Sequence, residues 1–199
     1  MNFIFLTRAS RPANLPAVKD SIRSAFSARH HTYQHIVLAD LGGNRSEEDF
    51  AHLEDRDTVV RFVREKPADD PYLAGAMDSV LSGLDAPGDS FVYVLDDDNA
   101  LSPRFPDIAP FCTADAVVFK ITGHPDWGLC QNGGASYLGK IDWANYAVRL
   151  SVMRILKIFR TGECSQLCDG VFFDRLIRHK CSVRFLNSEH AFYNYLSKP

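Results

Sequence analysis

The chain has 199 residues, of which 46% are hydrophobic and 24% charged, which predicts one globular domain with a substantial core. The formal net charge is −3 and the sequence has no basic cluster, which argues against a nucleic-acid-binding protein. No apolar run approaches ~18 residues, so no transmembrane segment is predicted, and the short apolar start fits a first strand better than a secretory signal.

The five cysteines are odd in number and unevenly spaced. This pattern predicts reduced thiols and a cytoplasmic protein rather than a disulfide framework. Cys164 and Cys168 could share one face of a helix and bind zinc together with His179 or His190. Because a second cysteine pair is missing, buried thiols are the favoured interpretation.

The first half of the chain alternates short apolar runs with segments of helical spacing, which predicts β-α-β units and a doubly wound sheet. The predicted strands are Phe3–Leu6, His35–Leu41, Thr58–Val63 and Phe91–Leu95. The predicted helices are Leu15–Ala28, Glu47–Leu53 and Pro71–Leu84.

Polar and charged residues follow three of these strands. Thr7, Arg8 and Arg11 follow the first strand, Asp40 closes the second, and Arg64 follows the third. In open α/β sheets ligands bind beyond the carboxyl ends of the strands, and arginine offers a planar fork of donors for a diphosphate. The alternatives are solvated surface charges and, at Asp40, a simple Asp-Leu-Gly-Gly turn.

The apolar strand Phe91–Leu95 leads directly into Asp96, Asp97 and Asp98. If the extended geometry persists, the first and third carboxylates point to one side and the second to the other. Crowded carboxylates need a cation or hydrogen-bond donors, and Mg²⁺ or Mn²⁺ takes one or two carboxylates together with waters and phosphates. The pattern predicts a metal–diphosphate site, with a polar loop that ends the strand as the alternative.

The second half contains two more predicted strands, Ala116–Ile121 and Val183–Leu186, and an amphipathic helix over Cys168–Ile177. The glycines and aromatic residues between 123 and 137, Trp127 among them, suit either an acceptor-binding wall or an ordinary hairpin. Asp142 could hold acceptor hydroxyls or a loop backbone. No repeat or linker divides the chain.

The segment from Val94 to Pro103 resembles the Asp-x-Asp segment of glycosyltransferases with the GT-A fold. Its Asp-Asp-Asp-Asn form is similar to that of glucuronosyltransferases and of small bacterial relatives of the inverting family that includes cellulose and chitin synthases. The first strand and its loop, through Pro12, are similar to the nucleotide-binding strand of the same enzymes. The resemblance implies a single GT-A domain over 1–199, in which a Rossmann-like mixed, mainly parallel sheet is flanked by helices. Its nucleotide-sugar-binding half would be 1–104, and its acceptor-binding and catalytic half 105–199.

The resemblance also implies a function, namely metal-dependent transfer of a sugar from a nucleoside-diphosphate sugar to a hydroxyl of a glycan or other acceptor. A UDP-sugar is the favoured donor and inversion the favoured outcome. Asp98, helped by Asp96, would hold Mn²⁺ or Mg²⁺ against the diphosphate. Asp97 or Asp96 would bind the ribose, and Asp40 the uracil or ribose.

The resemblance bears on four further parts of the sequence. Asp169, at the amino end of its predicted helix, matches the catalytic base, although the usual pair of adjacent acids is absent and a helix N-cap is the alternative. His190 matches a late histidine that ligates the metal in several relatives, with a structural histidine as the alternative. Residues 139–149 look like the strand that follows the acceptor region. Met77 and Asp78 replace an Arg-Asn pair of many relatives, and Asp78 is expected to face solvent.

Two other functions stay open. A nucleotidyltransferase acting on sugar phosphates shares the sheet and the metal–phosphate chemistry, but the first loop lacks the Gly-rich signature that cradles a triphosphate. A non-catalytic sugar- or nucleotide-binding transferase homologue, acting as a partner in polysaccharide assembly, is the third possibility.

Overall fold

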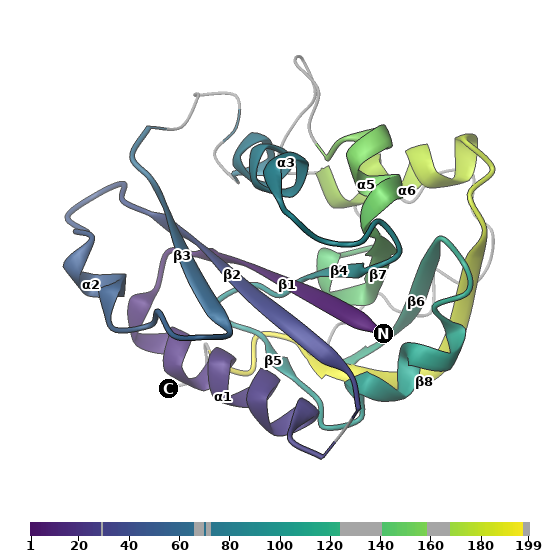
Figure 1. The fold of residues 1–199 in the computed structure, drawn as a ribbon, viewed down its shortest axis with the longest axis horizontal. Coiled ribbons are helices and arrows are strands. Elements are labelled where there is room, and N and C mark those ends of the chain that lie inside the picture. The colour runs from purple at the N-terminus through teal and green to yellow at the C-terminus, as the bar shows by residue number, and fades with distance from the viewer. Residues whose placement is uncertain (29, 66–69, 71–72, 124–140, 159–167, 197–199) are drawn as a thin grey trace.

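The computed structural model describes residues 1–28, 30–65, 70, 73–123, 141–158 and 168–196 (Figure 1). Within these residues the strands form one eight-stranded sheet in the order β3-β2-β1-β4-β7-β6-β8-β5. Strands β3, β2, β1 and β4 run parallel to one another, and β6 runs parallel to β8. The pairs β4–β7, β6–β7 and β5–β8 are antiparallel, so the sheet is mixed.

The described elements follow the expected order along the chain. The strands are β1 (Asn2–Ala9), β2 (Thr32–Asp40), β3 (Thr58–Val63), β4 (Phe91–Val94), β5 (Ala100–Leu101), β6 (Ala116–Thr122), β7 (Tyr146–Arg149) and β8 (Val183–Phe192). The helices are α1 (Leu15–Phe26), α2 (Glu48–Ala51), α3 (Ala74–Gly83), α5 (Leu150–Leu156) and α6 (Cys168–Arg178), with 3-10 turns η1 (Pro12–Asn14), η2 (Phe105–Phe111) and η3 (Trp143–Asn145). The strands and helices expected from the sequence are present, while α5, β5 and the 3-10 turns are additions and β8 is longer than predicted.

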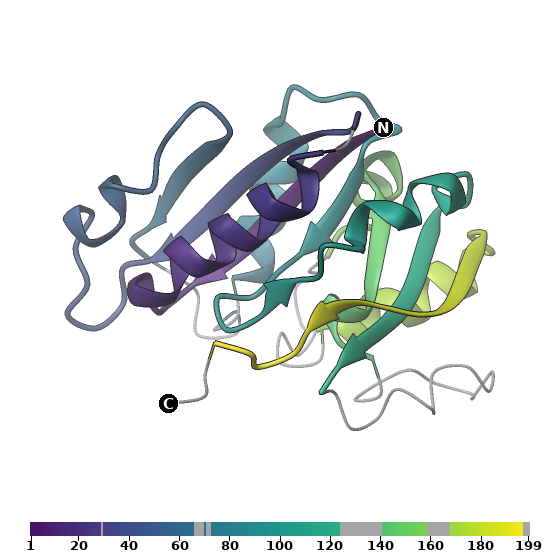
Figure 2. The same ribbon diagram turned by 90° about the horizontal axis from the view of Figure 1, so that it is seen from below.

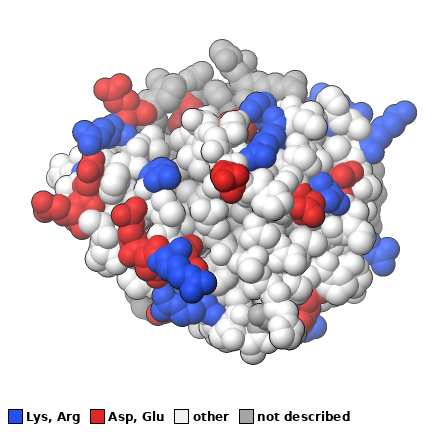
Figure 3. Space-filling view, viewed as in Figure 1, with Lys and Arg blue, Asp and Glu red and all other residues white. Residues whose placement is uncertain are grey.

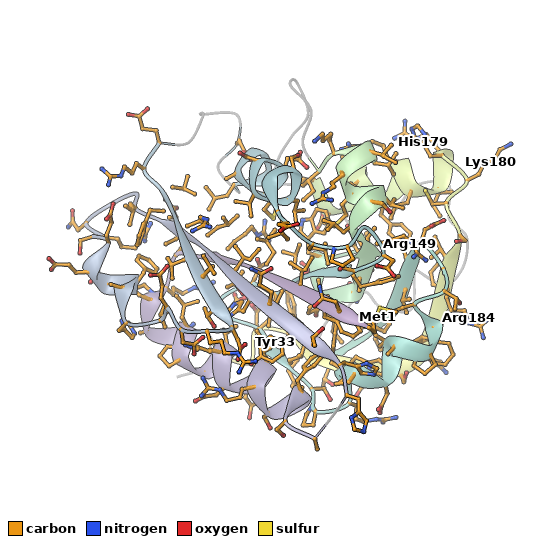
Figure 4. The ribbon with its side chains drawn as sticks, viewed as in Figure 1. Met1, Tyr33, Arg149, His179, Lys180 and Arg184 are labelled. Carbon is orange, nitrogen blue, oxygen red and sulfur yellow. The ribbon has the colours of Figure 1, made fainter. Side chains whose placement is uncertain are left out.

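Side-chain alternation along the central strands divides the core into two layers. Phe3 and Phe5 of β1 pack with α1 and η2, whereas Ile4 and Leu6 pack with α3, α5 and α6. Figures 1 and 2 show these helices on opposite faces of the sheet. Side chains fill the space on both faces, and Tyr33 of β2 lies over α1 (Figure 4). Burial of such apolar side chains contributes about 1.5–3 kcal/mol each, so both layers anchor β1 in place.

The polarity of the strands brings many segment ends to one edge of the sheet, which we call the ligand edge. The carboxyl ends of β1, β2 and β4 meet there because these strands are parallel. The amino end of β7 joins them because β7 is antiparallel to β4. The carboxyl ends of β6 and β8 follow for the same geometric reason. Residues far apart in the sequence therefore share one rim.

The side chain of Asp78 on α3 does not face solvent as expected. Its Oδ1 accepts a hydrogen bond of 2.7 Å from the amide of Ile158, just beyond α5. An amide at the end of a helix needs an acceptor when it lies inside the protein. Asp78 supplies that acceptor and ties α3 to α5, so the prediction for Asp78 was wrong.

Other expectations concern the surface and the thiols. No helix in the described part of the chain is long and apolar enough to cross a membrane. Acidic and basic side chains are interspersed on the face shown in Figure 3. Cys112, Cys168 and Cys181 are free thiols, while Cys130 and Cys164 lie outside the described residues.

Candidate active site

The three acids after β4 each bond with the carboxyl end of β1 or with the loop that follows it. The closest pair joins Arg8 to Asp96 through two parallel hydrogen bonds, 2.7 Å from Nε to Oδ1 and 2.6 Å from Nη2 to Oδ2. Both side chains are largely covered, with 16% and 23% of their surface exposed. Burial disfavours the charged guanidinium, but the Asp96 carboxylate outweighs it and raises the pKa of Arg8 above its ordinary value.

Asp97 organises the backbone of the loop after β1. Its Oδ2 accepts hydrogen bonds from the amides of Ser10 and Arg11 at 2.6 and 2.7 Å, and its Oδ1 accepts one of 3.0 Å from Arg11 Nε. Only 2% of Asp97 is exposed. These bonds account for the burial of a carboxylate, because amide and guanidinium donors replace its water.

Asp98 lies on the same side of the turn as Asp97, since Arg11 Nη2 bonds with both carboxylates, at 2.9 Å to Asp98 Oδ2 and 3.0 Å to Asp97 Oδ1. The expected alternation, with Asp96 and Asp98 together, was therefore wrong. Strand β4 ends at Val94, and the amide of Asn99 closes a turn onto the carbonyl of Asp96 at 3.0 Å. The extended geometry stops before the acids begin.

Asp40 lies at the end of β2, in the neighbouring part of the ligand edge. Its Oδ1 accepts from the amide of Gly42 at 2.9 Å, and its Oδ2 lies 3.5 Å from Arg45 Nη2. Arg45 also donates to the carbonyls of Asp40 and Ser10, at 2.7 and 3.1 Å. Arg45 thus bridges the loops after β1 and β2. Sequence reasoning missed it, although a basic residue just after a Gly-Gly turn at a strand end was a usable signal.

Asp142 and Asp169 approach the site from the other half of the chain. Asp142 caps η3, because its side chain accepts from the amide of Ala144 at 2.8 Å. Asp169 lies in the first turn of α6 and accepts from the amide of Gly170 at 2.6 Å. Two contacts join these segments, from Trp143 Nε1 to Cys168 Sγ at 3.4 Å and from the Tyr146 hydroxyl to the Asp169 carbonyl at 2.9 Å.

The electrostatic environment of Asp169 links it to the groups after β1 and β4. Burial raises the pKa of the Asp169 carboxyl to about 7, and the negative charge of Asp142 adds to the rise. The Gly170 amide and the Arg8 guanidinium oppose this rise in pKa. A carboxyl group that titrates near neutral pH can accept and release protons under ordinary conditions.

Tyr193, just beyond β8, is a further residue of this region that sequence reasoning missed. Burial raises the pKa of the Tyr193 phenol, and the charges of Asp142 and Asp98 contribute. The same tail places the amide of Leu196 2.9 Å from the carbonyl of Asp98. The end of the described chain therefore forms part of the ligand edge. An aromatic-rich tail after a late strand was the available signal.

Three other predicted site residues have different surroundings. Thr7 is buried, and its hydroxyl lies 2.9 Å from His35 Nε2 inside the sheet. Arg64 is paired with Glu47 beside α2 and has 75% of its side chain exposed. Trp127 lies outside the described residues. Their predicted roles in nucleotide or acceptor binding stay predictions.

His190 is 2% exposed, and both of its ring nitrogens have partners. Nε2 lies 2.7 Å from the Ser188 hydroxyl and Nδ1 lies 2.8 Å from the Arg104 carbonyl. Metal ligation by His190 requires one of these bonds to open. Within the described residues no group of three or more His, Cys, Asp or Glu side chains is arranged to hold a metal ion. His190 as a ligand therefore stays a prediction, while its geometry fits a structural role.

Comparison of the whole fold with solved structures identifies its architecture. The TarS 1–349 fragment of S. aureus, solved with UDP, matches with a TM-score of 0.74 at 13% identity, covering 97% of this chain and 60% of that one. The fold is GT-A. The GT-A mannosyltransferase PcManGT of Pyrobaculum calidifontis, solved with GDP-Man and Mn²⁺, matches with a TM-score of 0.70 at 12% identity, covering 97% and 56% of the two chains.

A shorter protein also shares this GT-A architecture. The 4-diphosphocytidyl-2C-methyl-D-erythritol synthase of Anaerococcus prevotii matches with a TM-score of 0.55 at 13% identity, covering 98% and 88% of the chains. No family model matches the sequence, and neither does any curated protein. This GT-A chain spans 60% or less of the TarS chains that it matches.

Proposed function

We propose that this GT-A chain is a glycosyltransferase that moves a sugar from a nucleoside-diphosphate sugar, with a UDP-sugar as the favoured donor, to an acceptor hydroxyl with inversion. The observation that carries the proposal is the arrangement at the ligand edge. An acidic turn bonded to two arginines adjoins a partly buried carboxylate whose pKa lies near neutrality. The first feature suits a diphosphate leaving group, and the second suits a general base.

The donor would lie across the loops after β1, β2 and β4. Arg8 and Arg11 present guanidinium groups whose planar geometry matches phosphate as well as carboxylate. On donor binding, Arg8 and Arg11 would give up some of their hydrogen bonds to Asp96 and Asp98. They would form hydrogen bonds with the diphosphate instead. Asp40, at the end of β2, would accept a hydrogen bond from the base or ribose, and Asp96 or Asp97 one from the ribose. The role of Asp97 is the most constrained, because its carboxylate already holds the backbone of the β1 loop.

Asp98 would hold the proposed Mn²⁺ or Mg²⁺, helped by Asp96 once the bonds between Asp96 and Arg8 open. The donor set fits such an ion, because it binds one or two carboxylates and completes its shell with waters and substrate phosphates. Both acids keep part of their surface exposed, 23% and 16% of their side chains. When bound, the ion would screen the charge of the diphosphate leaving group.

Asp169 would act as the general base. As the oxygen of the acceptor hydroxyl forms a bond to the anomeric carbon, the proton of that hydroxyl moves to the Asp169 carboxylate. The bond between that carbon and the diphosphate oxygen breaks, and its electron pair leaves with the diphosphate. Attack opposite the leaving group inverts the anomeric centre. The acceptor would lie between Asp169 and Asp142, with Trp127 as a further predicted contact.

Calorimetric titration with UDP and GDP, each with and without Mn²⁺, tests the donor site. We expect micromolar, metal-dependent binding of UDP to the wild type and at least tenfold weaker binding to Asp98→Ala. Asp20→Ala is the matched control, because it removes an exposed aspartate that pairs with Arg23 within α1, away from the acidic turn. If neither nucleotide binds under any of these conditions, the proposal fails.

A nucleotidyltransferase is the second candidate, favoured by the match with the erythritol synthase, which covers 88% of that shorter chain. Such an enzyme would bind a nucleoside triphosphate and a sugar phosphate. Incubation with nucleoside triphosphates and sugar phosphates would release pyrophosphate, whereas the transferase would release a nucleoside diphosphate from a nucleotide sugar. Product analysis therefore separates the two reactions.

A further inference from the structure

The acid that precedes η3 and the acid that begins α6 are held in one rigid unit. Beyond the two hydrogen bonds that join these segments, Trp143 packs on Phe172 with ring centroids 5.4 Å apart, and Tyr146 packs on Phe173 at 5.1 Å. All four rings are fully buried. Because buried aromatic rings in contact resist displacement, the amino ends of η3 and α6 keep a fixed separation.

Each carboxylate is also oriented by its own backbone contacts. Asp142 forms a capping box with Asn145, whose Oδ1 accepts from the Asp142 amide at 3.0 Å while the Asp142 side chain binds the turn. The Asp169 carboxylate is oriented by the amide of Gly170. Neither acid can turn away without losing a hydrogen bond from a backbone amide.

We propose that Asp142 is a positioning residue for Asp169, whose fixed negative charge makes the Asp169 carboxylate the stronger proton acceptor. The inference rests on the proposed function. Asp142 thereby has an electrostatic role besides its cap of η3 and any contact with the acceptor.

The groups that face Asp169 in the described part of the chain agree with this role. Asp142 and, more weakly, Asp96 raise the pKa of Asp169, while Arg8 lowers it. Burial raises the pKa of the Cys168 thiol to about 11 and raises that of the Tyr146 phenol, so both stay neutral near pH 7. Asp142 is therefore the main charged group that strengthens Asp169 as a proton acceptor.

The substitution Asp142→Asn separates charge from structure. Asparagine caps a helical turn about as well as aspartate, so the bond to the Ala144 amide can persist while the charge is lost. We expect the acidic limb of the pH profile of kcat/KM to move down by about one pH unit, because one nearby like charge has gone. Arg8→Gln should move the same limb upward, because it removes a positive charge.

A second readout does not depend on turnover. Carboxyl ¹³C NMR titration of the intact chain, with Asp169→Asn identifying the signal, should show Asp169 titrating about one unit lower in Asp142→Asn than in the wild type. Asp142→Ser, another good N-cap without charge, replaces Asp142→Asn if that variant fails to fold, as judged by circular dichroism. An unchanged Asp169 titration in a folded variant would overturn the proposal.

The two readouts distinguish this proposal from the function on which it rests. If the NMR shift appears but no nucleotide sugar is turned over, the transferase proposal and the base role fail, while the electrostatic pairing of the two acids stands. If turnover is normal and its pH profile does not move in Asp142→Asn, the transferase proposal survives and the positioning role is refuted.

Discussion

The carboxylates of the two acidic clusters at the ligand edge have opposite electrostatic surroundings. After β4, Asp96, Asp97 and Asp98 bond with Arg8 and Arg11, and the fold uses these bonds to fix the β1 loop. At the other cluster, Asp169 lies beside a second acid, and its nearest hydrogen bond comes from a backbone amide. Hydrogen bonds from arginine favour the charged form of a carboxylate and suit ligand binding, whereas partial burial near a like charge raises a carboxyl pKa and suits proton transfer.

The largest effect should come from removing the proton acceptor. Asp169→Asn is expected to lower kcat by 10²- to 10⁴-fold, because general base catalysis typically contributes that much. Nucleotide affinity should stay within threefold of the wild type, since Asp169 lies outside the acidic turn. Initial rates and calorimetry measure the two quantities. A rate within threefold of the wild type would remove Asp169 from the mechanism.

Within the acidic turn, neighbouring acids should differ sharply in structural importance. Asp97→Ala should lower the free energy of unfolding by about 3 kcal/mol, because it leaves the loop amides and Arg11 without their buried acceptor. Asp98→Ala should cost less than about 1 kcal/mol, since its partner Arg11 is 48% exposed and surface ion pairs contribute little. Urea unfolding at pH 7 compares the two variants. Equal losses would show that the turn is held as a whole rather than through Asp97.

The pH dependence of stability should also separate the clusters. The pKa of Asp169 is raised to about 7 from its ordinary value of 3.8, so the folded state keeps a proton that the unfolded chain releases. Stability due to this group is present below pH 4 and is lost as the pH rises through 7. The stability of Asp169→Asn relative to the wild type should therefore grow by roughly 2 kcal/mol between pH 5 and pH 8, measured by urea unfolding. A constant difference would contradict a raised pKa.

His35, whose Nε2 lies 2.9 Å from the Thr7 hydroxyl inside the sheet, should affect stability at acid pH instead. Burial lowers the pKa of His35 to about 3 from its ordinary value of 6.5, so the unfolded chain binds a proton that the folded state does not. Stability is lost as the pH falls below 6.5, by about 1–2 kcal/mol at pH 5. The glutamine of His35→Gln can still form a hydrogen bond with the Thr7 hydroxyl. This variant should not show the loss of stability at acid pH. An equal acid loss in variant and wild type would assign the effect to other groups.

Periodicity predicted most of the fold because the strands and helices of the first half are strongly patterned. The α/β class, the order of elements up to β4 and the helix that begins near Asp169 were predictable. Helix α5 was not, because it begins directly after β7 without a turn or a cap signal. The late strand was cut short because Asn187, Ser188 and Glu189 interrupt its apolar pattern, although β8 continues to Phe192. Backbone pairing with β6 overrides these polar residues.

The sequence by itself determined which acids and arginines end the strands, because apolar runs followed by charges mark the rim of an α/β sheet. Tertiary structure alone decided the partners. The end of β4 at Val94 placed Asp98 with Asp97 rather than with Asp96. The antiparallel pairing of β4 with β7 brought Asp142 and Asp169 to the edge that carries Arg8. Contacts between residues more than a hundred positions apart depend on sheet order, which local spacing does not encode.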